Sequence, residues 1–69
     1  MKYMHAALAS DIVNLAQKSV HDVYLQKGPV AVDAKSILGL MTIYDLENVE
    51  VICEDPDVVK MLKELLNEL

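Results

Sequence analysis

Four side chains of this 69-residue sequence could carry chemistry: His5, His21, Ser36 and Cys53. His21 and Cys53 could form a base–nucleophile pair. However, Cys53 falls on the inward phase of a predicted strand, where a small buried side chain is the stronger interpretation. The two histidines and the single cysteine lack the spacing of a metal site. The two glycines stand too far apart for a phosphate-binding loop, so we expect neither a metal nor a cofactor.

His5 and Ser36 each stand at the start of a predicted helix. The backbone N–H groups and the dipole there favour an anion, so a phosphorylated His5 would be stabilised. The alternative is a terminal histidine without a role. The Ser36 hydroxyl can cap its helix, which contributes about 1 kcal/mol. It could also carry a phosphoryl group that the same N–H donors would stabilise.

The run that follows Ser36 contains more apolar residues than one short helix can bury on one face. Some of them should therefore be exposed and form a docking surface for another protein. The alternative is that all of them enter the core. The residues concerned are Ile37, Leu38, Leu40, Met41 and Ile43.

Local patterns predict the elements that position these side chains. A helical stripe of apolar residues over 9–16 fades near Lys18 and Ser19. Alternating patterns over 20–26 and 30–33, separated by a Lys-Gly-Pro turn, predict a hairpin. Residues 48–54 alternate as another strand. Asp55, Pro56 and Asp57 then open a final helix, whose buried stripe is Val58, Val59, Leu62, Leu65, Leu66 and Leu69.

The predicted order is helix, strand, strand, short helix, strand and helix. This order is typical of an α+β sandwich with helices on one face of an antiparallel sheet. The length predicts a single domain over residues 1–69, and its core must be aliphatic because Phe and Trp are absent.

Charge and composition exclude several classes of partner. The net charge is −5, and residues 45–57 carry six carboxylates and no lysine, which argues against nucleic acid and anionic membranes. No apolar run approaches the roughly 20 residues of a spanning helix. One cysteine fits a reducing compartment, so we expect a cytoplasmic protein with an unprocessed N-terminus.

The segment DVYLQKGPVAVDAKSILGLMTI resembles HPr, the histidine phosphocarrier of the bacterial sugar phosphotransferase system, and its catabolite-repression homologue in low-GC Gram-positive bacteria. The similarity runs from about His5 to Leu69 and is most specific at Lys35-Ser36-Ile37 with Gly39 and Met41. It implies an HPr-like open-faced sandwich, four antiparallel strands under three helices, with the first strand short or missing here.

The resemblance also implies roles for individual residues. His5 takes the place of the phosphorylatable histidine, and Ser36 that of the serine phosphorylated by HPr kinase. The apolar residues after Ser36 take the place of the patch that contacts enzyme I, enzyme II A domains and the catabolite control repressor. We therefore assign partner binding to Ile37, Leu38, Leu40 and Met41.

The sequence departs from the family around His5. The family's His-Ala-Arg-Pro is His5-Ala6-Ala7-Leu8 here, and the chain contains no arginine to form bidentate hydrogen bonds with phosphate. Few residues precede His5. In an alternative register, residues 2–8 are the first strand, the helix begins after Ser10, and His5 has no role.

Three functions follow from these observations. The first is a regulatory or binding module with Ser36 as a switch. The second is a phosphocarrier that accepts phosphate on His5 from enzyme I, an intermediate in phosphotransfer rather than an enzyme in its own right. The third is an unrelated interaction domain. Loss of the first strand would open the edge of residues 48–54, which predicts a homodimer through that edge or a swapped N-terminal segment.

Overall fold

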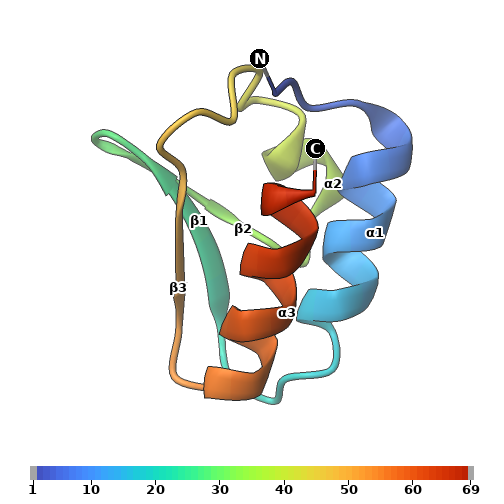
Figure 1. The fold of residues 1–69 in the computed structure, drawn as a ribbon, viewed down its shortest axis with the longest axis vertical. Helices are drawn as coiled ribbons and strands as arrows, with labels where there is room; N and C mark the ends of the chain where they lie inside the picture. Colours follow the sequence, from blue (N-terminus) through green and yellow to red (C-terminus); the bar gives the residue numbers. More distant parts are fainter. Residues whose placement is uncertain (1, 69) are drawn as a thin grey trace.

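The computed structural model describes residues 2–68, and its helices and strands follow the predicted order (Figure 1). Three antiparallel strands form a sheet in the order β2-β1-β3. The three helices cover one face of this sheet and leave the other open, which confirms the α+β open-faced sandwich. The elements are α1 (Ala6–Ala16), β1 (Val23–Lys27), β2 (Val30–Asp33), α2 (Ile37–Leu40), β3 (Glu50–Cys53) and α3 (Pro56–Asn67).

The central strand, β1, shows the predicted alternation from Val23 onward, but it begins later than the predicted range 20–26, and residues 20–22 are exposed outside it. Val23 and Leu25 are fully buried beneath the helices, whereas Tyr24 faces the open side of the sheet. Tyr24 is paired with Asp33 of β2 on one side and with Ile52 of β3 on the other. The β1–β2 hairpin turns at Gly28, whose φ of +58° lies in the left-handed region that glycine enters at little cost.

The third strand is shorter than the predicted range 48–54. Asn48 has a φ of +60°, a left-handed conformation that asparagine tolerates better than most residues. The chain is therefore not extended at this position, and β3 begins only at Glu50. At the other end, β3 stops at Cys53 and Asp55 caps α3.

The structure decides between the two registers considered for the N-terminus. Residues 2–4 do pair with another segment, since the Met4 N–H donates to the Tyr44 carbonyl at 2.8 Å and the Leu46 N–H to the Lys2 carbonyl at 2.9 Å. The pairing ends there, and α1 begins at Ala6 with His5 as its N-cap. The register in which residues 2–8 form a strand is wrong, because the helix has already started at Ala6.

The two edges of the sheet are consequently β2 and β3. Within residues 2–68, β3 pairs with β1 alone, because the N-terminal segment pairs with residues 44–46 through a single bridge, Tyr3 to Asp45. The first strand of the expected sandwich is thus reduced to this short contact. The outer edge of β3 is open, as predicted.

The last helix follows its sequence signals closely. The Asp55 carboxylate accepts hydrogen bonds from the N–H groups of Asp57 and Val58 at 3.1 and 3.4 Å, and Pro56 occupies the first turn. In the predicted stripe, Val58, Leu62 and Leu66 are buried and Val59 and Leu65 are partly buried. Leu69 lies outside the described residues.

The core is aliphatic and includes two residues of the apolar run after Ser36. Leu40 is fully buried and Ile43 nearly so. The assignment of Leu40 to partner binding is therefore wrong, because its side chain is buried in the core and cannot contact a partner. Ile37, Leu38 and Met41 are exposed, as expected for a helix that cannot bury every apolar side chain.

Alanine substitutions at Leu40 and Leu38 should separate these two environments. We expect Leu40→Ala to lower the free energy of unfolding by about 2–5 kcal/mol, because it removes a buried side chain and leaves a cavity. Leu38 is 84% exposed, so Leu38→Ala should change it by less than about 0.5 kcal/mol. Urea denaturation followed by circular dichroism measures both, and equal losses would contradict the assignment of Leu40 to the core.

Candidate functional site

His5 is the N-cap of the eleven-residue helix α1. Its backbone is extended, with φ −148° and ψ 168°, and its Nδ1 accepts a hydrogen bond from the Leu8 N–H at 3.3 Å. Because Nδ1 is the acceptor, the neutral imidazole carries its proton on Nε2. The side chain is exposed, so a phosphoryl donor could reach it.

The first turn of α1 offers an anion only backbone donors. The N–H groups of Ala6 and Ala7 belong to the opening turn of the helix, where no intrahelical carbonyl is available to them. The side chains of Ala6, Ala7 and Leu8 carry no charge, and the chain contains no arginine. A phosphoryl group on His5 would therefore depend on the helix terminus for its stabilisation within this chain.

Ser36 is the N-cap of α2, as predicted. Its hydroxyl oxygen accepts a hydrogen bond from the Gly39 N–H at 3.1 Å. A Cβ on residue 39 would stand 3.4 Å from that oxygen, which is an ordinary van der Waals distance. The Ser36 side chain is partly exposed. Its geometry is that of a cap, and its modification stays a prediction.

Three exposed apolar side chains follow this cap. Ile37, Leu38 and Met41 form what we call the α2 surface, and Leu38 is the most exposed of them. The helix packs against α1 and β2 with its opposite side, which buries Leu40. The α2 surface therefore lies on the outside of the helix layer, next to the serine that begins the helix.

An aromatic pair lies at the same end of the molecule. The rings of Tyr3 and Tyr44 are stacked, with centroids 4.6 Å apart and planes inclined by 25°. Tyr44 is 68% exposed and Tyr3 38%. This pair was not predicted from the sequence, because stacking between residues far apart in the chain produces no local pattern. The one sequence signal for this pair was Tyr44 itself, an aromatic residue in the loop after the α2 segment.

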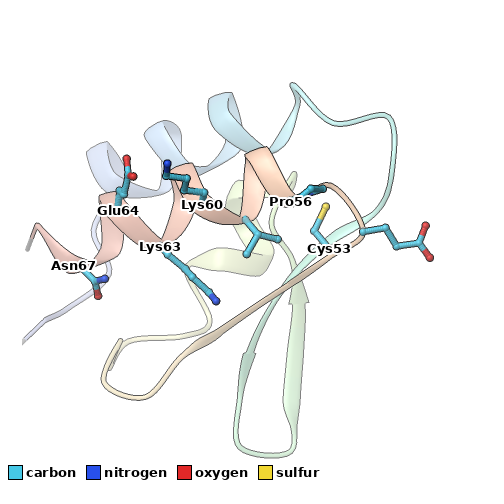
Figure 2. Close-up of a pocket in the computed structure, with 8 residues that line it drawn as sticks. Cys53, Pro56, Lys60, Lys63, Glu64 and Asn67 are labelled. Carbon is cyan, nitrogen blue, oxygen red and sulfur yellow. The ribbon is translucent and has the colours of Figure 1, made fainter.

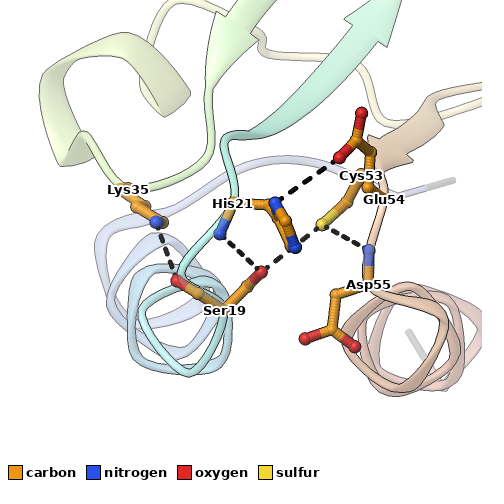
Figure 3. Close-up of polar contacts among 6 residues, drawn as sticks. All are labelled: Ser19, His21, Lys35, Cys53, Glu54 and Asp55. Atoms are coloured by element: carbon orange, nitrogen blue, oxygen red, sulfur yellow. Dashed lines mark hydrogen bonds and ion pairs between the residues drawn. The ribbon is translucent and has the colours of Figure 1, made fainter.

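The pair of His21 and Cys53 is not arranged for nucleophilic catalysis. Nδ1 of His21 lies 3.5 Å from a carboxylate oxygen of Glu54 (Figure 3). Sγ of Cys53 accepts a hydrogen bond from the Asp55 N–H at 3.3 Å and lies 3.8 Å from the Ser19 hydroxyl. These contacts join the loop after α1 to the start of α3, which is a structural role.

An open groove of about 580 Å³ runs along α3 from the end of β3 (Figure 2). Cys53, Pro56 and Val59 line its apolar part. The amino groups of Lys60 and Lys63 point in different directions in Figure 2, so they do not converge on one anion. Across residues 2–68, no cluster of three or more His, Cys, Asp or Glu side chains could hold a metal ion.

The length and composition of the helices decide whether any of them could cross a membrane. In the part of the chain that the structure describes, none of the helices combines the length and the apolar character needed to cross a bilayer.

The fold and the capped histidine define an HPr-like phosphocarrier fold of the phosphotransferase system. The family described as "PTS HPr component phosphorylation site" matches residues 2–69. The chain belongs to this PTS-HPr family.

Solved structures agree with this membership. Crh, the catabolite repression containing protein of Bacillus subtilis, shares 30% identity over 96% of this chain and 82% of its own, with a TM-score of 0.84. HPr-C-His of Thermoanaerobacter tengcongensis shares 30% identity over 97% and 81%, with a TM-score of 0.78. A solid-state NMR structure of the Crh dimer shares 31% identity over 94% and 79%, with a TM-score of 0.67. No curated protein matches the sequence.

The hydrogen bond between the His5 side chain and the Leu8 N–H caps α1. We expect His5→Ala to lower the free energy of unfolding by about 1 kcal/mol, because the Leu8 N–H loses its acceptor. His5→Asn is the matched control, since asparagine is a preferred N-cap and should retain most of that stability. Urea denaturation gives the energies, and hydrogen exchange at the Leu8 amide reports the bond itself. If His5→Ala and the wild type were equally stable, the cap would contribute nothing.

Proposed function

We propose that this protein is a regulatory or binding module of the bacterial sugar phosphotransferase system that docks partner proteins through the α2 surface, with Ser36 as its phosphorylation switch. The observation that carries this proposal is the exposure of Ile37, Leu38 and Met41 on a helix that begins at Ser36. By family resemblance, the partners are enzyme I, enzyme II A domains, HPr kinase and the catabolite control repressor. The same proposal assigns the protein to the cytoplasm.

Burial of the α2 surface would supply binding free energy. Complete burial of an exposed leucine contributes about 1.5–3 kcal/mol before the costs of association. A phosphoryl group on Ser36 would add about two negative charges beside these apolar side chains. Because the charges border the surface rather than cover it, phosphorylation would alter the choice of partner. A partner with cations at the matching position would gain affinity, and an acidic one would lose it.

A second candidate function is phosphotransfer through His5, as a carrier that accepts the phosphoryl group from enzyme I. The cap geometry favours it, because His5 is exposed at the N-terminus of α1 and its Nδ1 already faces the first turn. The missing arginine weighs against it, since a phosphoryl group needs cationic neutralisation that backbone N–H groups supply only in part. We therefore rank this function second.

One experiment separates these functions. The protein is incubated with HPr kinase and ATP, and separately with enzyme I and phosphoenolpyruvate, and the phosphate is mapped by mass spectrometry under non-acidic conditions. We expect a stable phosphate on Ser36. Leu38→Glu should slow this phosphorylation at least about tenfold, because it places a charge in the docking surface. Val20→Glu is the matched control, since Val20 is 95% exposed and lies in the loop between α1 and β1, outside the α2 surface.

The other outcomes are equally informative. An acid-labile phosphate on His5 after the enzyme I reaction would support the carrier. No phosphate on either residue would contradict both Ser36 as a switch and His5 as a carrier. Equal rates for Leu38→Glu and Val20→Glu would show that the α2 surface does not contact the kinase.

A homodimer is part of the proposal. The outer edge of β3 has no partner strand within residues 2–68, and unpaired strand edges tend to pair with another chain. In its crystal structure, Bacillus subtilis Crh is an intertwined dimer with a swapping domain. We propose that two copies of this chain associate through the β3 edge or by exchange of the N-terminal segment.

Sedimentation equilibrium tests the dimer. We expect the mass of two chains at high micromolar concentration, with a shift toward the single chain on dilution. Amide hydrogen exchange in Glu50–Cys53 should slow as the concentration rises, because pairing protects the edge. A single-chain mass at every concentration would contradict the proposal.

A further inference from the structure

The aromatic pair formed by Tyr3 and Tyr44 is held in place by the backbone. Hydrogen bonds from Met4 to Tyr44 and from Leu46 to Lys2 bracket it on both sides. Directly after Tyr3, Met4 places its side chain in the core and is only 5% exposed. The backbone around both rings is therefore hydrogen-bonded, and the exposure of Tyr44 follows from the fold.

The pair adjoins His5. Side chains alternate along an extended segment, so Tyr3 and His5 project to the same side while Met4 projects to the other. Two residues of extended chain span about 7 Å, and His5 is extended. From this alternation we place His5, Tyr3 and Tyr44 in one row, next to the start of α1.

The net charge of the chain favours a cation from outside. Asp45 is paired with Lys27 at 3.7 Å, whereas the nearby Glu47 is exposed to solvent. The whole chain has a net charge of −5. An electron-rich tyrosine face attracts a cation, most often an arginine, within about 6 Å of the ring centre. A guanidinium can also stack flat on the ring and donate in parallel to an anion beside it.

From this arrangement we propose that Tyr44, supported by Tyr3, is the docking site for an arginine side chain of the partner protein. The guanidinium stacks on the exposed ring of Tyr44, within reach of His5. The partner thereby supplies an arginine, a residue type that this chain does not contain. The proposal deepens the function proposed above and rests on it, because the same partner covers the α2 surface.

The occupant is a different protein and not a second copy. A second copy of the chain contains no arginine and repeats the negative net charge. A lysine is a weaker match, because its ammonium is compact and strongly hydrated and cannot stack on a ring. The chemistry of the site therefore selects an arginine-bearing protein.

Calorimetric titration with HPr kinase and with enzyme I tests this inference on Tyr44 variants. We expect Tyr44→Phe to bind as the wild type does, because the ring remains. Tyr44→Leu should bind about fivefold more weakly, because the cation–π contact is lost. Thermal unfolding checks that each variant is folded. If Tyr44→Leu is not, Tyr44→Met replaces it as a second variant without a ring.

Conversion of the partner's arginines to citrulline tests the cation itself, since citrulline keeps the shape without the charge. The fivefold difference between the wild type and Tyr44→Leu should then disappear. A difference that persists would make Tyr44 an ordinary apolar contact and overturn the proposal. Equal binding by Tyr44→Leu and the wild type, with loss in Leu38→Glu, would also overturn it but leave the proposed function intact. No binding by the wild type to either partner would overturn both.

Discussion

The short backbone pairing between residues 2–4 and 44–46 is the contact on which the arrangement of this molecule depends. It ends at Met4, whose side chain enters the core, and this leaves His5 extended and ready to cap α1. The same contact draws the loop after α2 toward the start of α1. It also means that the N-terminal segment does not pair with β3, whose outer edge stays open.

The two candidate phosphorylation sites share the same capping geometry and differ in their surroundings. Each is an N-cap whose side chain accepts an N–H from the opening turn, at 3.3 Å for His5 and 3.1 Å for Ser36. Ser36 is followed by the exposed α2 surface, which suits protein docking. His5 is followed by two alanines and a leucine in a chain without arginine, so an anion there would need a cation from elsewhere. Tyr44 provides a place where a partner could present one.

Much of the fold could be predicted because its signals act over a few residues. Asp55 with Pro56 begins α3, Ser36 begins α2, and the alternation of Val23 and Leu25 with Tyr24 marks a half-buried strand. The length of β3 could not be predicted in this way, because the left-handed conformation of Asn48 is one that asparagine permits without requiring it. Leu40 was misassigned for a similar reason. A run of apolar residues indicates that some must be exposed, but only the packing of α2 on α1 and β2 selects which.

The amino-acid sequence alone determined the order and type of the elements, the caps at Ser36 and Asp55, the aliphatic core and the resemblance to HPr. The tertiary structure decided that α1 begins at Ala6, that Leu40 is buried while Leu38 is exposed, and that Tyr3 stacks on Tyr44. The difference between these two groups of features has a physical cause. Capping and periodicity depend on neighbours within one or two turns of the chain. Burial and stacking instead depend on residues that meet only once the chain has folded.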